Sequence, residues 1–495
     1  MMFNTFRFLV FLGPVLLVYF LIQPRLRRLW LLVISICFYG LWGPQYLLIL
    51  LFCIVVTFTS GRLLGACPPE RIKRRKTILT IGMGLDLSIL FFFKYINMFI
   101  DLVDQILPVW GITPLPRSEI LLPIGISFYV FQSVGYMIDV YRGKVEASRD
   151  LIEFSLFVTF FPQLVAGPIE RSGNLIGQLR SLDQRQLWDP ARIRSGFYTM
   201  LWGYFMKTVI ADRAAMIADL VFENAALYGS VELILGILCF SLQIYCDFGG
   251  YSAIAIGLAQ IMGIELMENF RVPYFSGSIK EFWGRWHISL STWFRDYLYI
   301  PLGGNRKGRW KKYRNLLIVF LVSGLWHGAD WSFVIWGGLH GVYQIAEDWL
   351  APYRTRLLEK YKVNTDCFSW RLLNGMWVFL LTTFAWIFFR ADSIQTAIAY
   401  IGRIFTCADP WILFDGGIFT LGIAPQEMFL LLTAVLVLLC VDVLYLKTGK
   451  KLGDLLKTQN LWFRGAVTLG LICACVFFNC AKSAVGTGQF IYFQF

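Results

Sequence analysis

Residues 306–331 read RKGRWKKYRNLLIVFLVSGLWHGADW, a stretch that joins a basic cluster, an apolar run and a histidine. Basic residues crowd the beginning of this stretch, and an apolar run that could enter a membrane as a helix follows. The run ends at His327, which a helix rising about 1.5 Å per residue would carry roughly 20 Å from the basic end. We expect Gly328 to end the helix and Asp330 to start the return. Because an ionisable group at membrane depth is costly, its default interpretation is functional.

A second motif at 282–304, FWGRWHISLSTWFRDYLYIPLGG, carries His287 among aromatic and polar residues. The turn expected at 301–304 separates it from the basic stretch, so we expect an interrupted helix on the cytoplasmic half. The two imidazoles would then lie at different depths, His327 being deep or toward the outer side. A neutral imidazole can move protons near neutral pH, which makes both residues candidates for catalysis. The alternative for His287 is a helix-end histidine that bonds a backbone carbonyl.

The third and last histidine, His340, follows two glycines on the next apolar stretch. We expect it to form a hydrogen bond that joins neighbouring helices.

The composition of the chain indicates a polytopic membrane protein. Of its 495 residues 57% are hydrophobic, and the charged residues fall in short clusters between apolar runs. A helix needs about 20 residues to cross a bilayer core of about 30 Å. Apolar stretches that span or nearly span such a core occur near 5–22, 29–43, 45–60, 77–99, 196–211, 231–246, 313–326, 331–346, 372–389, 426–446 and 463–481.

Shorter apolar pieces contain proline, glycine and polar residues, which predicts re-entrant or broken helices. They lie near 121–140, 151–166, 251–264 and 285–300. The whole chain, 1–495, is expected to form a single integral membrane domain, with 391–425 as a partly ordered external loop. Its parts would be N-terminal helices over about 1–110, a core with both motif histidines over about 121–346, and C-terminal helices over about 372–481.

Membrane topology explains the formal net charge of +13. Four basic clusters, at 25–28, 71–76, 306–314 and 447–451, fall on one side if the N-terminus is outside, and that side is expected to be cytoplasmic. Membrane lipid is the expected partner, because basic side chains beside apolar segments meet anionic headgroups. No nucleic-acid-binding motif accompanies the clusters, so nucleic acid is not expected as a partner.

The residue types present also limit the chemistry. No serine or cysteine stands in a nucleophile-elbow context, so covalent catalysis by the protein has no candidate. The three histidines lack the tight spacing of zinc ligands, and neither a metal nor a bound cofactor is expected. A histidine acting as general base on an incoming hydroxyl needs instead a tunnel, an activated acyl donor such as a thioester, and exclusion of water.

Other polar residues accompany the histidine motifs. Residues 245–251, YCDFGGY, place Asp247 and Tyr251 at a glycine-rich point where we expect a helix to break. Arg285, Arg295 and Asp296 flank His287, and two roles are open to them. They either pair with each other and hold a re-entrant segment together, or they bind a phosphate of the donor.

The stretch 160–171, FFPQLVAGPIER, is a broken apolar segment that suits a wall or gate, although a kinked core helix is equally compatible. Together with the two histidine motifs it strongly resembles the membrane-bound O-acyltransferase (MBOAT) family. The resemblance runs from the apolar stretch at 29 to the C-terminal residues 490–495, FIYFQF. Within the family, residues 299–305, YIPLGGN, resemble the alginate-type branch.

The resemblance implies an all-helical membrane fold, with a ring of about 11 transmembrane helices plus re-entrant helices around a central tunnel. It implies that His327 is catalytic and that His287 is its partner. The residues expected to contact substrate or line the tunnel are Trp286, Ser289, Arg295, Asp296, Trp326, Asp247 and Tyr251.

The resemblance also implies a reaction: transfer of an acyl group, usually acetyl, from a cytoplasmic donor such as acetyl-CoA or another acyl thioester. The acceptor would be an extracytoplasmic polysaccharide, whether alginate, peptidoglycan, cellulose or another exopolysaccharide. Relatives commonly hand the acetyl group to an exported, esterase-like partner of the SGNH type. The expected location is the bacterial inner (cytoplasmic) membrane, with multiple passes.

Two alternatives stay open at this point. A D-alanyl transferase of the teichoic acid type shares much of the motif around His287 and differs only in donor and acceptor. A polytopic transporter or flippase also uses broken helices and polar residues at the midplane. However, the polar motifs cluster at 245–331, and no paired, similarly interrupted segments are evident. That pattern favours an enzyme with one composite site.

Overall fold

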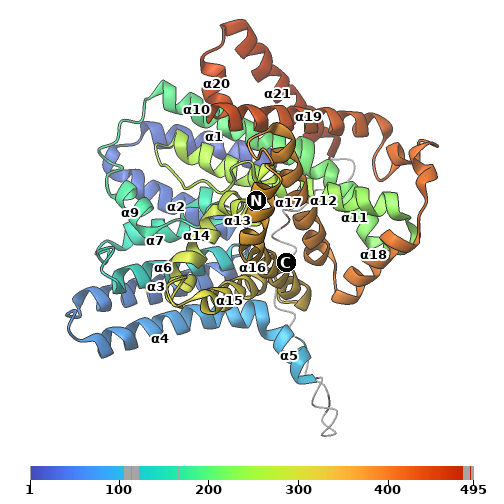
Figure 1. The fold of residues 1–495 in the computed structure, drawn as a ribbon. Coiled ribbons are helices and arrows are strands. Elements are labelled where there is room, and N and C mark those ends of the chain that lie inside the picture. Colours follow the sequence, from blue (N-terminus) through green and yellow to red (C-terminus); the bar gives the residue numbers. More distant parts are fainter. Residues whose placement is uncertain are drawn as a thin grey trace. The chain divides into compact units, whose positions relative to one another are not determined.

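The computed structural model describes residues 2–104, 113, 117, 122–165, 167–482 and 491, with side chains described up to 478 and at 491. Every regular element within these residues is a helix, which confirms the predicted all-helical class for this part of the chain (Figure 1). The C-terminal motif predicted at 490–495 lies outside them except for Ile491.

Six helices in the described part of the chain are long and apolar enough to cross a membrane, by length and composition. They are Pro44–Ala66, Ile72–Asp104, Ser230–Ile261, Phe368–Arg390, Pro425–Thr448 and Leu461–Phe478. These helices support a multi-pass membrane protein, because a helix satisfies its own backbone groups within the membrane. The larger number of about 11 spans stays a prediction.

The chain divides into two compact units. Unit 1 comprises Met1–Met200 and Ser252–Met267, and unit 2 comprises Leu201–Tyr251 and Glu268–Phe495. The helices of unit 1 are α1 (Phe6–Leu21), η1 (Pro24–Leu26), α2 (Arg27–Gly40), α3 (Pro44–Ala66), α4 (Ile72–Leu90), η2 (Phe91–Tyr95), α5 (Ile96–Asp104), α6 (Ile126–Tyr141), α7 (Leu151–Thr159), α8 (Phe161–Leu164) and α9 (Ser172–Arg180). Most of α10 (Pro190–Tyr204) and the end of α12 (Ser230–Ile261) also belong to it.

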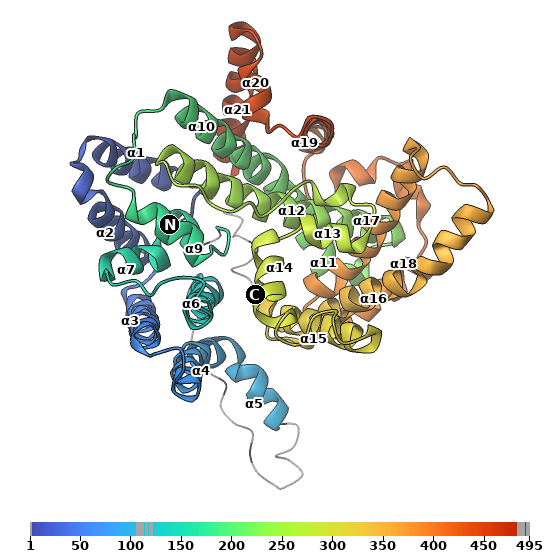
Figure 2. The same ribbon diagram turned by 60° about the vertical axis from the view of Figure 1, so that its left-hand side comes forward.

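In unit 1, α3, α4 and α6 pack against one another (Figures 1 and 2). Small residues make this approach possible: a Cβ on Gly82 would lie 2.4 Å from Oγ of Ser60. Arg75, in the first turn of α4, donates to the carbonyls of Leu64 at 2.9 Å and Tyr141 at 2.8 Å. This one side chain therefore satisfies carbonyl groups at the ends of two helices.

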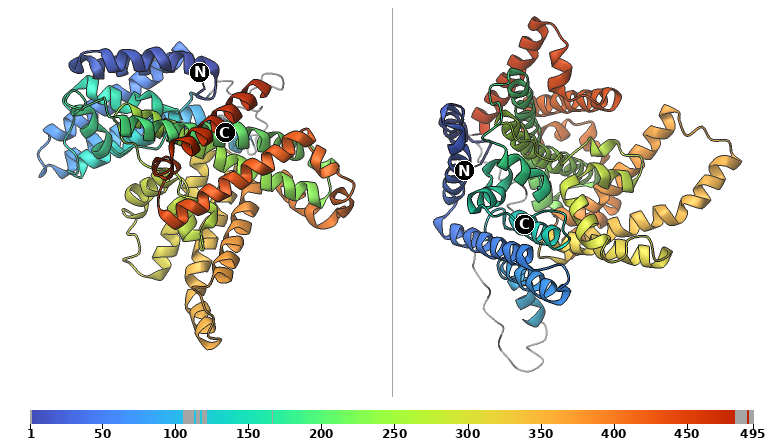
Figure 3. Two further views of the ribbon diagram at one scale, coloured as in Figure 1. Left: turned by 90° about the horizontal axis from the view of Figure 1, so that it is seen from above. Right: turned by 90° about the vertical axis from the view of Figure 1, so that its left-hand side faces the viewer.

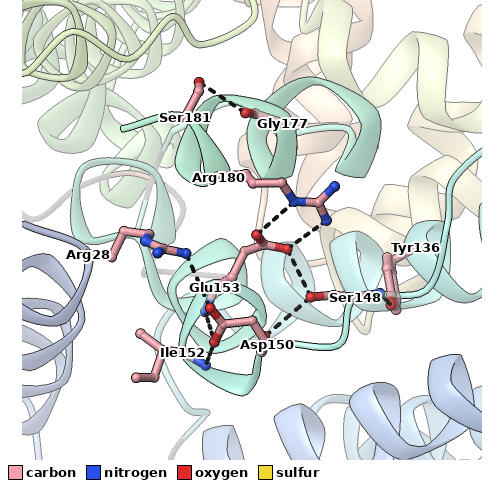
Figure 4. A network of polar contacts seen from close by, with 9 residues as sticks. All are labelled: Arg28, Tyr136, Ser148, Asp150, Ile152, Glu153, Gly177, Arg180 and Ser181. Atoms are coloured by element: carbon pink, nitrogen blue, oxygen red, sulfur yellow. Dashed lines mark hydrogen bonds and ion pairs between the residues drawn. The ribbon is translucent and has the colours of Figure 1, made fainter. Parts of the chain in front are cut away.

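A polar network joins α2, α6, α7 and α9 (Figure 4). Its centre is Glu153, whose carboxylate accepts two hydrogen bonds of 3.1 Å from Arg180. Ser148 donates to the same carboxylate at 2.9 Å, and its own N–H donates to the hydroxyl of Tyr136 at 2.9 Å. Arg28 pairs with Asp150 at 3.2 Å. The bidentate geometry fixes the start of α7 more firmly than a single contact would.

The predicted helix break at 151–166 is confirmed, because α7 ends before Phe160 and α8 starts after it. Its buried polar groups bond within unit 1: the N–H of Phe161 donates to Oγ of Ser35 at 3.1 Å, and Gln163 donates to Gln132. Of the two interpretations of 160–171, these contacts fit a kinked core segment.

Two other predicted breaks are wrong. Within 121–140, α6 is continuous from Ile126, because buried polar side chains such as Gln132, which donates to the carbonyl of Phe157 at 2.6 Å, find partners on neighbouring helices. Within 251–264, α12 is continuous to Ile261, and the glycines at 249 and 250 lie inside it. A Cβ on Gly250 would lie 2.8 Å from a backbone carbonyl of α10, so glycine serves close helix packing there.

The helices of unit 2 are η4 (Phe205–Ala211), α11 (Asp212–Glu223), η5 (Ala225–Leu227), η6 (Pro273–Phe275), α13 (Ile279–Arg285), α14 (Ile288–Phe294), η7 (Arg295–Tyr299), α15 (Arg309–His327), α16 (Trp331–Lys360), α17 (Phe368–Arg390), α18 (Ile394–Thr406), η8 (Pro410–Leu413), η9 (Gly417–Thr420), α19 (Pro425–Thr448), α20 (Leu452–Lys457) and α21 (Leu461–Lys482). The first part of α12, to Tyr251, belongs to it as well. The predicted loop at 391–425 therefore contains α18 and the two short 3-10 helices η8 and η9.

An antiparallel hairpin of α15 and α16 positions the candidate site. As predicted, α15 ends at His327 and Gly328 caps it, while the carboxylate of Asp330 accepts from the N–H of Ser332 at 2.7 Å and starts α16. The turn at 361–367 then connects α16 to α17 (Figure 3). Beside the hairpin, the predicted break at 285–300 is confirmed as the succession of α13, α14 and η7.

Candidate active site

His287 and His327 meet inside unit 2, with ring centroids 6.4 Å apart. The prediction that they lie at different depths is therefore wrong. The reason is that the interrupted helix folds back: α13 packs against α16 and η7 against α15, and His287, at the junction of α13 and α14, comes beside the end of α15. Both imidazoles are buried, at 0% and 3% exposure, although both side chains are ionisable.

The tautomer of His327 follows from its partner. Its Nδ1 lies 2.7 Å from the carbonyl oxygen of Ser323, one turn earlier on α15. A carbonyl can only accept a hydrogen bond, so Nδ1 carries the proton and Nε2 of the neutral ring keeps its lone pair. The ring is enclosed by aromatic groups, with the centroids of Trp336 and Trp326 at 4.8 and 4.9 Å. This enclosure excludes water from the candidate base.

In His340 the two ring nitrogens have the opposite roles to those in His327. The indole N–H of Trp283 donates to its Nδ1 at 3.2 Å, and an indole nitrogen can only donate. The lone pair of His340 is therefore on Nδ1 and is occupied by a bond between α13 and α16. The predicted helix-joining role of His340 is confirmed by this contact.

The two predicted tryptophans have different surroundings. Trp326 lies beside both candidate histidines, with its ring centroid 5.9 Å from that of His287 and 4.9 Å from that of His327. Trp286 is 1% exposed and stacks on Phe282, with centroids 5.5 Å apart and planes at 15°. Trp326 therefore borders the imidazole pair, while Trp286 belongs to the aromatic packing of α13.

A cavity of about 840 Å³ runs along α13, α14, η7, α15 and α16. On α15 its lining extends from Lys312 to Ser323, which lie roughly 16 Å apart on a helix rising about 1.5 Å per residue. One end therefore adjoins the residue that bonds His327. The lining also carries the cationic side chains of Lys280, Arg295, Lys312 and Arg354 and the carboxylates of Glu347 and Asp348.

Arg295 forms the ion pair predicted for it, whereas its binding of a donor phosphate stays a prediction. Its Nε lies 2.8 Å from the carboxylate of Asp296, and its 60% exposed side chain also lines the cavity. In the same lining, Nζ of Lys312 donates to Asp348 at 2.5 Å. This hydrogen bond from Lys312 holds the pKa of Asp348 below its ordinary value, so Asp348 is ionised at neutral pH.

Asp247 and Tyr251 belong to a different cluster. Lys207 pairs with Asp247 at 2.5 Å and with Asp212 at 3.0 Å, and its ammonium lies 5.5 Å from the ring centroid of Tyr251. The N–H of Ile491 also donates to Asp247, at 2.8 Å. The predicted site residues Asp247 and Tyr251 are thus brought to a buried lysine and do not line the cavity.

Sequence reasoning missed Lys207 and Asn269. Lys207 is a lone cation in the apolar run FMKTVIA, and that interruption was the available signal. Asn269 is buried at 1% and lies 3.2 Å from Nδ1 of His287. It also accepts the hydroxyl of Ser289 at 2.7 Å, so the predicted site residue Ser289 faces Asn269 and is absent from the cavity lining.

Comparison of the sequence with those of known proteins identifies relatives of this chain. The sequence model of MBOAT, the membrane-bound O-acyltransferase family, matches residues 146–391. A Pseudomonas putida protein named "Probable alginate O-acetylase AlgI" is 41% identical over 417 residues, covering 83% of this chain and 81% of that protein. The "Peptidoglycan O-acetyltransferase" of Helicobacter pylori is 34% identical over 431 residues, covering 80% and 78%. The "Teichoic acid D-alanyltransferase" of Bacillus subtilis is 29% identical over 257 residues, covering 48% and 63%.

Proposed function

This chain belongs to the membrane-bound O-acyltransferase family, and we propose that it moves an acetyl group from a cytoplasmic thioester toward a polysaccharide outside the membrane. Membrane O-acyltransferase activity follows from the family. The acetyl group, the donor, the direction and the acceptor are the proposed parts. The observation that carries the proposal is the cavity that extends along α15 from cationic side chains to Ser323, the residue that bonds His327.

In the proposed reaction His327 is the general base. Its Nε2 takes the proton of the acceptor hydroxyl while the hydroxyl oxygen attacks the carbonyl carbon of the thioester. The C–S bond then breaks, and the leaving sulfur takes the proton from His327, so no net proton is consumed. His287 is the proposed partner, because its ring lies 6.4 Å from that of His327. The surrounding tryptophans keep water from competing for the acyl group.

The proposed donor is acetyl-CoA or another acyl thioester. Its phosphates would meet the cationic lining at Lys280, Arg295, Lys312 and Arg354, while the thioester reaches the apolar part near Phe320. The phosphates carry charges that the hydrocarbon core rejects, so the donor stays on one side and only the acyl group moves on.

The proposed acceptor is a polysaccharide, as the printed names of the alginate and peptidoglycan relatives suggest. Because the transferred group must leave the membrane, we propose that an exported esterase-like (SGNH-type) partner receives it. The corresponding location is the bacterial inner membrane, with the basic loops in the cytoplasm.

Proteoliposomes would test this function. Acetyl-CoA is supplied on the side of the basic loops, and an acceptor polysaccharide with the exported partner on the other. We expect free CoA thiol on the donor side and labelled acceptor on the other. Intact substrate that crosses with no bond cleaved would establish a transporter instead. Transfer from a D-alanyl carrier protein, with none from acetyl-CoA, would establish the D-alanyl transferase alternative.

A further inference from the structure

We propose that Asn269 is the positioning residue of His287, fixing both the tautomer and the orientation of this imidazole for acyl transfer. The inference rests on the proposed function and adds a residue to its site. Asn269 lies in unit 2 on the segment between α12 and α13, and His287 lies at the junction of α13 and α14.

The contacts of Asn269 with Ser289 identify which atom of Asn269 faces the ring. The backbone N–H of Ser289 lies 3.3 Å from the side-chain atom assigned as Oδ1, and the hydroxyl of Ser289 lies 2.7 Å from it. A backbone N–H can only donate. The atom that meets it must therefore be the amide oxygen and not the amide nitrogen.

The tautomer of His287 follows from its contact with this oxygen. The same amide oxygen lies 3.2 Å from Nδ1 of the ring. Because an amide oxygen only accepts, Nδ1 carries a proton and Nε2 of the neutral ring keeps its lone pair. His287 thus has the same tautomer as His327, and its Nε2 can exchange a proton with a reacting group.

Asn269 also holds the backbone at His287. His287 has φ 43°, in the left-handed region that a non-glycine residue rarely adopts. Two backbone bonds hold this conformation: the N–H of Ile288 donates to the carbonyl of Asn269 at 2.9 Å, and the N–H of Arg271 donates to that of Arg285 at 2.9 Å. The segment 269–271 therefore braces the junction from both sides, and Asn269 supplies the backbone bond as well as the side-chain bond.

The test compares acetyl-CoA turnover by the purified full chain with that of Asn269→Ala and Asn269→Asp. We expect Asn269→Ala to lower kcat about 10- to 100-fold, the range for groups that orient a metal-bound imidazole. KM for acetyl-CoA should stay within about threefold, because the residue does not touch the donor. Asn269→Asp keeps an accepting oxygen and should recover most of kcat.

A pH profile adds a readout that a purely structural role would not move. A carboxylate beside the ring stabilises the imidazolium form, so Asn269→Asp should shift the acid side of the kcat profile to higher pH. The other titratable ring nearby is His327, and the profile is therefore compared with that of the wild-type protein. This variant keeps the test decisive if Asn269→Ala does not fold.

Asn315→Ala is the matched control. Asn315 is as buried as Asn269, and its amide donates to the carbonyls of Leu302 at 3.3 Å and Gly304 at 3.0 Å, with no histidine involved. The Asn315→Ala substitution should lower the thermal stability of the protein and leave kcat largely unchanged.

Three outcomes would overturn the inference. They are an Asn269→Ala variant with wild-type kcat, a loss confined to KM, or an aspartate variant that is as slow as the alanine variant. Wild-type protein that cleaves no thioester would overturn the proposed function itself, and this inference with it.

Discussion

His327 and His340 are both buried, but their Nδ1 atoms meet opposite kinds of partner, a carbonyl and an indole N–H. We expect His327→Ala to reduce acetyl transfer by about 10² to 10⁴, the usual contribution of general acid–base catalysis. His340→Ala should instead lower the melting temperature and leave most of the turnover, because it removes a bond between helices. Assays on equal amounts of folded protein would check the pair. Similar loss of turnover in both variants would contradict the assignment.

The charge of the cavity lining leads to a second prediction. Asp348 is ionised and neutralises Lys312, so Asp348→Asn should attract an anionic donor more strongly. For an exposed pair worth up to about 1 kcal/mol, KM for acetyl-CoA should fall by at most about fivefold. The control is Asp366→Asn, the same charge change at a 92% exposed side chain outside the cavity lining. An equal fall in KM in both variants would show that the net charge of the protein, and not the charge of the cavity lining, causes the change.

Single residues differ in how well the sequence predicts them. His287 and His327 could be identified because an imidazole in an apolar chain is conspicuous. Their proximity could not, since it depends on how α13 and α14 fold back beside the hairpin. Asn269 gives no local signal, because asparagine is common in loops and its partner lies 18 positions away. Asp247 was noticed, but its pairing with Lys207 depends on how the chain brings η4 to α12.

At the scale of elements, glycines set the distance between α15 and α16. A Cβ on Gly337 would lie 2.2 Å from the carbonyl oxygen of Phe320, whereas one on Gly338 would lie 3.5 Å from a side chain of Leu321. We expect Gly337→Ala to destabilise the protein by about 1–3 kcal/mol through overpacking. Gly338→Ala should be neutral or stabilising, since alanine favours a helix by up to about 1 kcal/mol. Thermal unfolding of both in detergent would decide, and equal melting temperatures would contradict the packing argument.

The segment after α12 is anchored by Glu268, which pairs with Lys451 at 2.5 Å and with Arg271 at 2.6 Å. Burial raises the pKa of Glu268, but the hydrogen bonds from Lys451 and Arg271 outweigh it and hold the pKa below its ordinary value. Its stabilisation is therefore present above the unfolded pKa of about 4.3 and is lost as the pH falls through the folded pKa. The melting temperature of wild type should exceed that of Glu268→Gln at neutral pH and approach it in acid. A pH-independent difference would contradict this.

Helix ends and helix breaks were not equally predictable. The end of α15 at His327 follows from local signals, a glycine and then an aspartate that caps the next helix. The breaks predicted in α6 and α12 were wrong because polar residues and glycines serve packing between helices there. Such roles depend on neighbours that are distant in the sequence, so a local pattern does not distinguish them from a true interruption.

At the scale of the whole molecule, topology is the property to test. We expect the loops at 62–76 and 305–314 to face the cytoplasm, because both are strongly basic. Cysteines introduced at the exposed positions Lys73 and Lys307, in a background without the 11 native cysteines, would report this. Neither should react with an impermeant reagent added to intact cells, and both should react after permeabilisation. Labelling of either loop from outside would reverse the orientation.

The scarcity of histidine makes the site unusually easy to observe by magnetic resonance. With three histidines in the chain, selective 15N labelling yields signals from six ring nitrogens. The spectrum shows whether Nδ1 or Nε2 of a ring carries the hydrogen. His287 and His327 would give the pattern of a protonated Nδ1, and His340 that of a protonated Nε2. The protein thus carries an internal reference ring, against which the electronic state of the proposed pair can be followed in a membrane without any added probe.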